Sequence, residues 1–561
     1  MSLPDKAPSQ WGVRYCWLLI LVVALGALMS RVPRLSLRPM HTDEAVHADK
    51  FGDLLEANYY EYDPDEYHGP TLNYATLISA ALGGHNRYIE ITEATVRLVP
   101  IAFSILTIVL TVLLVRGLGW ATLPIALLTA VSPAVFFYSR YYIQETLLVC
   151  FTFGVLICGY RYARTKRLGW VIAAGAFVGL MHATKETCVI ALGAMGMALA
   201  LVRFVGAPKE SRSVSAVFKG LCPAHLLIGL LTGVGVSALF CSSFFSHPRG
   251  ILDSYLTYAT YLGRGGGHDT THVHAWHYYL QMLLYSRYGG GPIWSEAAIV
   301  LLALVGMIGA WRGKAIRGVD LGFVRFMALY TVILTALYSA IPYKTPWCLL
   351  TFLHGMIVLA GVGAVLLVTA VSKPALRGIV VVLLAAGVGH LAFQSYRGSF
   401  VYQADSRNPY VYAHPTEEIF SVVERVYEYA DTGLLGSAAM PLQVACVGKD
   451  YWPLPWYLRS LQVDWRSEVP ARIGPGILLS PEFENDLARR LYVETPASER
   501  RMFMYLLDDP YYAWFRPEVK LVGFVRKDLW EAWYQRPDPT ELIEKQRERE
   551  SEPAGDAVRQ Q

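Results

Sequence analysis

The chain is poor in charged residues for its length, and this shortage bounds what it can be. Charged residues make up 17% of the 561 positions, against about a quarter in a typical soluble domain. Hydrophobic residues make up 54%, and the net charge is only +4. This balance excludes a nucleic-acid partner and predicts a polytopic membrane protein.

Several motifs are also absent. The eight cysteines include no C-x-x-C pair, so neither a disulfide framework nor a cysteine-ligated metal is predicted. No G-x-G-x-x-G or Walker A sequence lies between a strand and a helix, which leaves a nucleotide-sugar or ATP-driven mechanism without support. No internal repeat is visible either, whereas secondary transporters are commonly built from inverted repeats.

Long apolar runs are what the sequence does contain. About eleven runs are long enough, at roughly twenty residues, to cross a bilayer core of ~30 Å as helices. They begin near Trp17, Val96, Ala121, Thr146, Leu168, Thr187, Ala224, Ile293, Leu321, Trp347 and Leu376. The first run follows Lys6 and Arg14 and precedes no small-residue cleavage site, so we expect a retained helix and not a signal peptide.

Basic residues concentrate in alternate loops, as the positive-inside rule requires. These loops contain Arg116; Arg161, Arg164, Lys166 and Arg167; Arg203, Lys209, Arg212 and Lys219; Arg312, Lys314 and Arg317; and Lys373 and Arg377. We therefore predict a multi-pass plasma-membrane protein with a cytoplasmic N-terminus. An odd number of spans places the acidic and histidine-rich loops, together with the C-terminal region, outside the cytoplasm.

The composition changes to mixed charged and apolar sequence after the last run. Helical periodicity at 415–431 and 483–491, with strand-like runs at 442–447 and 520–525, predicts a small α/β domain. The predicted organisation is an all-α transmembrane domain at 1–395, an extracytoplasmic α/β domain at 396–543 and a disordered, highly charged tail at 544–561.

The first outer loop contains adjacent carboxylates at Asp43 and Glu44. The sequence from 43 to 55 suits a helix on the membrane surface, whose dipole would keep Asp43 ionised. An ionised aspartate there can act as a general base toward a hydroxyl or an amine. The competing interpretation is that both carboxylates merely cap this helix.

Charged residues also lie in the short second and third outer loops. Arg140 suits a phosphate, and Glu145 suits an acid or a hard-cation ligand; alternatively, the two pair with each other. Lys185 and Glu186 lie between two spans, where a charge implies function. A lysine that snorkels to the interface is the alternative for Lys185.

The fourth and fifth outer loops add histidines and one lysine. His272, His274 and His277 have spacings that could hold zinc or another transition metal. The spacing is loose and no cysteine joins it, so hydrogen bonding to a sugar or a phosphate is the favoured alternative. Lys344, beside Tyr343, suits a lipid phosphate, while interfacial anchoring by Tyr343, Lys344 and Trp347 is the alternative.

The order of these motifs resembles the GT-C membrane glycosyltransferases over about residues 17–370. Within that superfamily the chain is similar to the protein mannosyltransferase-like and aminoarabinose-transferase-like enzymes. The first-loop pattern from His41 to His47 looks like the flippase activity-associated subfamily. The matching motifs are Asp43-Glu44, Tyr67-His68-Gly69-Pro70-Thr71-Leu72, Arg97-Leu98-Val99-Pro100, Ser132-Pro133 with Arg140 and Glu145, Gly179 with Lys185, and Tyr343-Lys344-Thr345-Pro346.

The resemblance implies inverting transfer of a sugar from a polyprenyl-phosphate donor to an extracytoplasmic acceptor, which is a lipid, a glycan or a protein. It implies that Asp43 is the general base and that Glu44 orients the acceptor or the base. His68-Gly69-Pro70 stands where Lys-Pro-Pro is more usual, which leaves Arg140, Lys185 or Lys344 to bind the phosphate. The predicted substrate-binding residues are His41, His47, Tyr67, His68, Arg140, Glu145, Lys185, His277, Tyr343 and Lys344.

No cofactor is firmly predicted, and a divalent metal held by Glu145, His272 and His274 stays open. Two other functions also stay open at this point. One is a flippase, or a flippase-associated protein, that moves a lipid-linked sugar. The other is a metal-dependent oligosaccharyltransferase-like enzyme, whose Trp-Trp-Asp type motif has only a poor counterpart in Asp450-Tyr451-Trp452.

Overall fold

The protein forms two compact units in a computed structural model, Met1–His414 and Pro415–Gln561. The structure describes residues 10–64, 68–206, 222–263, 272–313, 318–432 and 441–536. The expected domain boundary at 395/396 lies within the last long helix of the first unit, Pro374–Phe400. The tail expected to be disordered, 544–561, lies outside the described residues.

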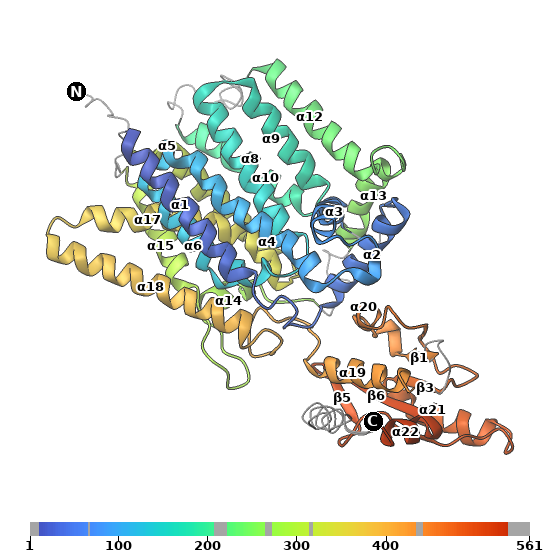
Figure 1. The fold of residues 1–561 in the computed structure, drawn as a ribbon. Helices are drawn as coiled ribbons and strands as arrows, with labels where there is room; N and C mark the ends of the chain where they lie inside the picture. Colours follow the sequence, from blue (N-terminus) through green and yellow to red (C-terminus); the bar gives the residue numbers. More distant parts are fainter. Residues whose placement is uncertain are drawn as a thin grey trace, which may run out of the picture. The chain divides into compact units, whose positions relative to one another are not determined.

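The first unit is helical throughout (Figure 1). Its longer helices are α1 (Gln10–Arg31), α2 (Thr42–Ala57), α3 (Thr71–Gly83), α4 (Glu93–Leu110), α6 (Thr122–Val131), α8 (Glu145–Thr165), α9 (Leu168–His182), α10 (Cys188–Gly206), α12 (Pro223–Cys241), α13 (Gly250–Gly263), α15 (Ala297–Trp311), α16 (Leu321–Ala340), α17 (Leu350–Ala370) and α18 (Pro374–Phe400). Short helices and turns connect them: η1 (Tyr88–Glu90), η2 (Thr111–Leu114), α5 (Val115–Leu118), η3 (Gly119–Ala121), α7 (Pro133–Tyr138), α14 (Tyr278–Leu284) and η6 (Pro346–Leu349).

The apolar runs of the sequence form these helices. Six helical stretches in the described part of the chain are long and apolar enough to cross a membrane, and four shorter apolar helices accompany them. The runs expected at Val96 and Ala121 belong to one continuous stretch, Glu93–Val131. The run expected near Ile293 begins as a helix at Ala297. The predicted multi-pass helical architecture is confirmed.

Small residues allow two of these helices to approach closely. On α9 and α12, Gly175 and Gly179 face Gly229 and Gly233, so that a Cβ at Gly175 would lie 2.2 Å from the Gly229 carbonyl oxygen. Both pairs are spaced four residues apart, which is the G-x-x-x-G pattern of close helix contacts in membranes. A larger side chain at Gly175 would force α9 and α12 apart.

The second unit is a mixed α/β domain. Its helices are α19 (Glu418–Ala430), α20 (Leu454–Tyr457), α21 (Glu484–Arg489) and α22 (Lys527–Tyr534), with short turns η7 (Val447–Lys449), η8 (Pro481–Phe483) and η9 (Arg490–Glu494). Its strands are β1 (Leu442–Ala445), β2 (Val463–Arg466), β3 (Gly476–Leu479), β4 (Phe503–Tyr505), β5 (Tyr512–Arg516) and β6 (Val519–Arg526). The strand order is β2-β1-β3-β6-β4, with β5 also on β6. The β2-β1-β3 part is parallel, and the strands on β6 are antiparallel.

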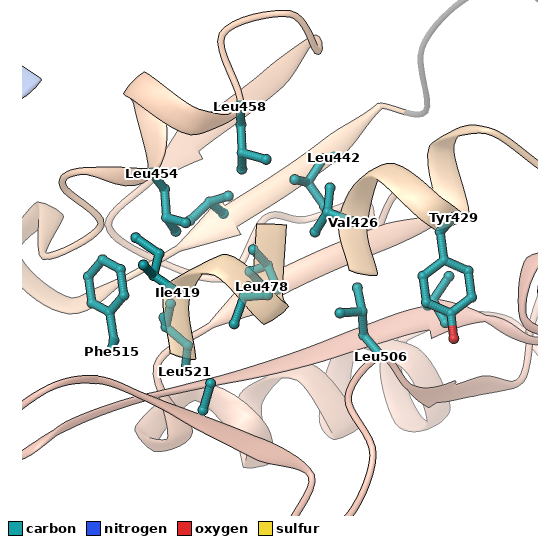
Figure 2. Close-up of a cluster of buried hydrophobic side chains, with 14 of the residues drawn as sticks. Ile419, Val426, Tyr429, Leu442, Leu454, Leu458, Leu478, Leu506, Phe515 and Leu521 are labelled. Carbon is teal, nitrogen blue, oxygen red and sulfur yellow. The ribbon is translucent and has the colours of Figure 1, made fainter. Parts of the chain in front are cut away.

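Side chains of this sheet alternate between two cores. Val444 and Leu478 pack with Ile419 of α19 in one cluster, and Figure 2 shows Leu478 and Ile419 within it. Their neighbours Ala445 and Leu479 belong to a second cluster. Because successive side chains of a strand point to opposite faces, each central strand serves both cores. The predicted small α/β domain is confirmed.

Candidate active site

The Asp43-Glu44 pair lies in the first turn of α2. His41 is the N-cap, and its Nδ1 accepts a hydrogen bond from the backbone N–H of Asp43 at 3.0 Å. In return, the Glu44 carboxylate accepts from the backbone N–H of His41 at 3.1 Å. This reciprocal arrangement is a capping box, and it fixes both carboxylates at a helix N-terminus.

Glu44 is enclosed and holds its full set of hydrogen bonds. Its side chain is 0% exposed. One oxygen accepts from Arg38, Arg97 and the backbone N–H of Tyr142, and the other accepts from Arg38, Arg97 and His41, at 2.8–3.1 Å. Burial raises the pKa of Glu44, but the two arginines outweigh it and lower the pKa to about 2. Glu44 therefore has no oxygen left for an acceptor and positions the start of α2.

Asp43 is the open member of the pair, with 43% of its side chain exposed. Its carboxylate lies 3.7 Å from His41 Nδ1. Burial raises the pKa of Asp43, but its electrostatic interactions with His41, His47, His68 and Lys185 lower it by more, so the pKa lies below its ordinary value of 3.8. Asp43 is thus an ionised, accessible carboxylate at neutral pH.

Two backbone hydrogen bonds between residues 69–71 and 183–184 position His68 near Asp43. The Gly69 N–H donates to the Thr184 carbonyl at 3.1 Å, and the Thr71 N–H donates to Ala183 at 3.2 Å. A Cβ at Gly69 would lie 2.2 Å from the Ala183 carbonyl oxygen, so this approach requires glycine. His68 Nδ1 then lies 2.8 Å from Glu186 Oε2.

Lys185 and His47 occupy the same neighbourhood. The buried Lys185 ammonium contacts Glu145, so the expected alternative of an Arg140–Glu145 pair is wrong. His47 is buried, with its ring 6.1 Å from that of His68. Burial lowers the pKa of His47 to about 3, so at neutral pH it is a neutral hydrogen-bonding group.

The loop that contains His272 and His274 (the histidine loop) contacts the loop that contains Lys344 (the lysine loop). The Lys344 N–H donates to the His272 carbonyl at 2.9 Å, and Lys344 Nζ donates to the carbonyls of His274 and Ile341. His272 Nδ1 lies 2.7 Å from the Tyr412 hydroxyl, and His41 Nε2 lies 3.1 Å from the Tyr412 carbonyl oxygen. Because His41 Nδ1 accepts from Asp43, Nε2 carries the proton and donates to Tyr412.

Four other predicted residues are placed as follows. Tyr343 packs its ring 5.0 Å from His272. Arg140 is buried and donates to the backbone carbonyls of Pro33 and Arg34 at 2.9 Å, and its own carbonyl accepts from Arg38. His277 is exposed at the start of α14, and Tyr67 lies outside the described residues.

The proposed metal ligands are not gathered into one set. Glu145 contacts Lys185, whereas His272 and His274 both contact the Tyr412 hydroxyl, at 2.7 and 3.4 Å. Across the part of the chain that the structure describes, no three histidine, cysteine or acidic side chains are grouped so as to hold a metal ion. Metal dependence stays an untested prediction.

The sequence interpretation did not name Arg38 or Arg97 as site residues, and both hold Glu44. It gave Glu186 a functional role but no partner, and the structure pairs Glu186 with His68. An arginine inside the apolar α4 was a usable signal for Arg97, because a charge there needs a partner. No sequence signal pointed to Tyr412, which reaches His41 from 371 residues further along the chain.

Comparison with known proteins agrees with this architecture. Residues 67–232 match the family model described as dolichyl-phosphate-mannose-protein mannosyltransferase. No curated protein sequence matches the chain.

Two solved structures of ArnT from Cupriavidus metallidurans are similar to most of the chain. The apo structure is 15% identical with a TM-score of 0.56, and the structure bound to undecaprenyl phosphate is 14% identical with a TM-score of 0.55. Each match covers 90% of this chain and 97% of that one. The S. cerevisiae Pmt1-Pmt2 complex bound to the sugar donor is 20% identical over 42% of this chain and 34% of its own, with a TM-score of 0.33, too low to carry weight.

The likeness to the flippase activity-associated subfamily stays a prediction. The chain has the fold of the ArnT structures, and its resemblance to the protein mannosyltransferase-like and aminoarabinose-transferase-like branch of the GT-C superfamily is confirmed.

Proposed function

We propose that this protein is an inverting membrane glycosyltransferase, which moves a sugar from a polyprenyl-phosphate donor to an acceptor on the extracytoplasmic side. The observation that carries the proposal is Asp43, an accessible and ionised carboxylate fixed in the first turn of α2. It lies on a fold shared with a structure that contains undecaprenyl phosphate. The cations and histidines around Asp43 complete the set of groups that such a transfer needs.

The reaction needs one base and one site for a leaving phosphate. The acceptor hydroxyl or amine gives its proton to Asp43 and attacks the anomeric carbon on the face opposite the phosphate. The bond from that carbon to the phosphate oxygen breaks, and its electron pair leaves with the polyprenyl phosphate. Of the three candidate cations, Lys185 acts on Asp43 electrostatically, so we assign it to stabilise that leaving group.

An apolar groove suits the donor lipid. It has a volume of about 500 Å³ and lies between α14, α15, α16 and α17. Trp276 and Ala340, which line it, lie close in sequence to the histidine loop and to Lys344. A polyprenyl chain in this groove would hold its phosphate near the polar loops, which explains why the site is built on membrane helices.

Purified protein in liposomes tests the function directly. We would supply radiolabelled polyprenyl-phosphate sugars together with membrane lipid, glycan and peptide acceptors, and then identify the labelled product. Transfer with inverted anomeric configuration, lost in Asp43→Asn, is the expected result. Lipid movement without transfer would instead identify a flippase, and chelator-sensitive transfer to peptide asparagine would identify an oligosaccharyltransferase.

A further inference from the structure

A small, partly open cavity lies among three arginines, two of which pair with Glu44. Its walls include Arg38, Arg97, Arg140, Phe137, Ser399 and Gln403. Its volume of about 10 Å³ accommodates roughly one water-sized sphere. All three arginines are at least nine-tenths buried, so bulk water does not screen them.

Two arginine donors and one hydroxyl of this wall are buried without a partner. They are Arg38 Nε, Arg140 Nη1 and Ser399 Oγ. Other atoms of both guanidinium groups are well bonded: Arg38 Nη2 donates to Glu44 and to the Arg140 carbonyl, and Arg140 Nη2 donates to two backbone carbonyls. A buried donor without a hydrogen bond costs about 1–3 kcal/mol. An acceptor between these three atoms would remove this cost.

The charges around the cavity favour an anion over a neutral acceptor. Three arginines line it, Arg38, Arg97 and Arg140, and in the described part of the chain the one carboxylate that pairs with them is Glu44, which bonds Arg38 and Arg97. Burial, together with the charges of Arg38, Arg97 and Arg31, lowers the pKa of Arg140 to about 9. Burial also lowers the pKa of Arg38 to about 10, despite Glu44. The cluster lacks negative charge.

We propose that this cavity binds one small inorganic anion of halide size, held by Arg38 Nε, Arg140 Nη1 and Ser399 Oγ. A phosphate or a sugar exceeds the space, whereas a monatomic anion fits it and supplies the missing charge. The bound anion holds Arg38 against Glu44 and so stabilises the start of α2. The site is separate from the proposed transfer chemistry, and its test uses no activity readout.

Bromide and chloride are the probes. Crystals of the full chain grown in bromide should give an anomalous peak bounded by Arg38, Arg140 and Ser399. The melting temperature in detergent should be about 1–3 °C higher in chloride than in gluconate at equal ionic strength, and the rise should saturate. A cavity without a bromide peak, together with equal melting temperatures in the two salts, would mean that it holds water and would overturn the proposal.

Variants separate this site from general salt effects. Arg140→Gln and the milder Ser399→Val should lose most of the chloride response. Arg407→Gln, on an arginine outside the cavity that pairs with Asp405, should keep it. A chloride response that is unchanged in both cavity variants would contradict the proposal. If Arg140→Gln fails to fold, Ser399→Val and the bromide peak still decide the matter.

Discussion

The first turn of α2 has an open side and a closed side, which are formed by the adjacent residues Asp43 and Glu44. On the open side, Asp43 is 43% exposed among His41, His68 and Lys185. On the closed side, Glu44 is 0% exposed, and two arginines and two backbone N–H groups saturate it. The difference teaches that a pair of carboxylates is not a catalytic pair when one partner's oxygens are all bonded. One carboxylate is accessible, as the proposed base must be, and the other holds the start of the helix.

Removing the open carboxylate should give the largest effect. Asp43→Asn should lower the rate of sugar transfer by about 10²–10⁴-fold, the usual contribution of a general base. The melting temperature should change little, because the side chain is partly exposed. Asp53→Asn is the matched control, since Asp53 is exposed on the same helix. Full turnover in Asp43→Asn with authentic substrates would remove the base assignment.

Removing the closed carboxylate should act mainly on folding. Glu44→Gln leaves Arg38 and Arg97 buried without their counter-charge, which costs about 3–5 kcal/mol. Thermal unfolding in detergent would measure this loss. Glu56→Gln, at an exposed glutamate of α2, should be nearly neutral. Equal melting temperatures for Glu44→Gln and Glu56→Gln would show that the closed side is not structural.

Acidic pH should lower the stability of the folded chain, whereas neutral pH should leave the ion pairs of Glu44 intact. The pKa of Glu44 is about 2 in the folded chain and ordinarily 4.5, so its stabilisation is complete above pH 4.5 and is lost as pH falls to 2. This loss is about 3 kcal/mol. His47 is buried in its neutral form, and its pKa is about 3 in the folded chain against an ordinary 6.5. It therefore adds a loss of stability that begins as pH falls below 6.5. Melting curves across pH should therefore slope downward from pH 6.5, and His47→Gln should flatten the upper part only.

Loosening the lysine loop should give the smallest effect. Lys344→Ala removes the bonds from Nζ to the carbonyls of His274 and Ile341. We expect the KM for the donor to rise about tenfold while kcat stays within about threefold. Steady-state kinetics with varied donor would measure both, with Lys373→Ala as the control at an exposed lysine outside this loop. A fall in kcat with an unchanged KM would place Lys344 in the chemical step instead.

Much of the fold could be predicted because it depends on local pattern. Apolar length alone identified the membrane helices, and short strand-like runs identified β1 and β6. The site was harder. Asp43, Lys185 and His68 stood out as charged or polar groups near apolar runs, but Arg140 was assigned to phosphate and instead lies against backbone carbonyls. Its direction depends on where α1 ends, and no local pattern encodes that.

The sequence by itself determined a helical membrane domain, a small α/β domain and the presence of an acidic pair beside the membrane, because hydrophobicity and residue period act locally. Only the tertiary structure decided which carboxylate stays open. Arg38 comes from the turn before α2 and Arg97 from α4, 53 residues after Glu44, and Tyr412 comes from the end of the first unit. Burial and pairing between distant segments set exposure and pKa, and these are properties of the folded chain.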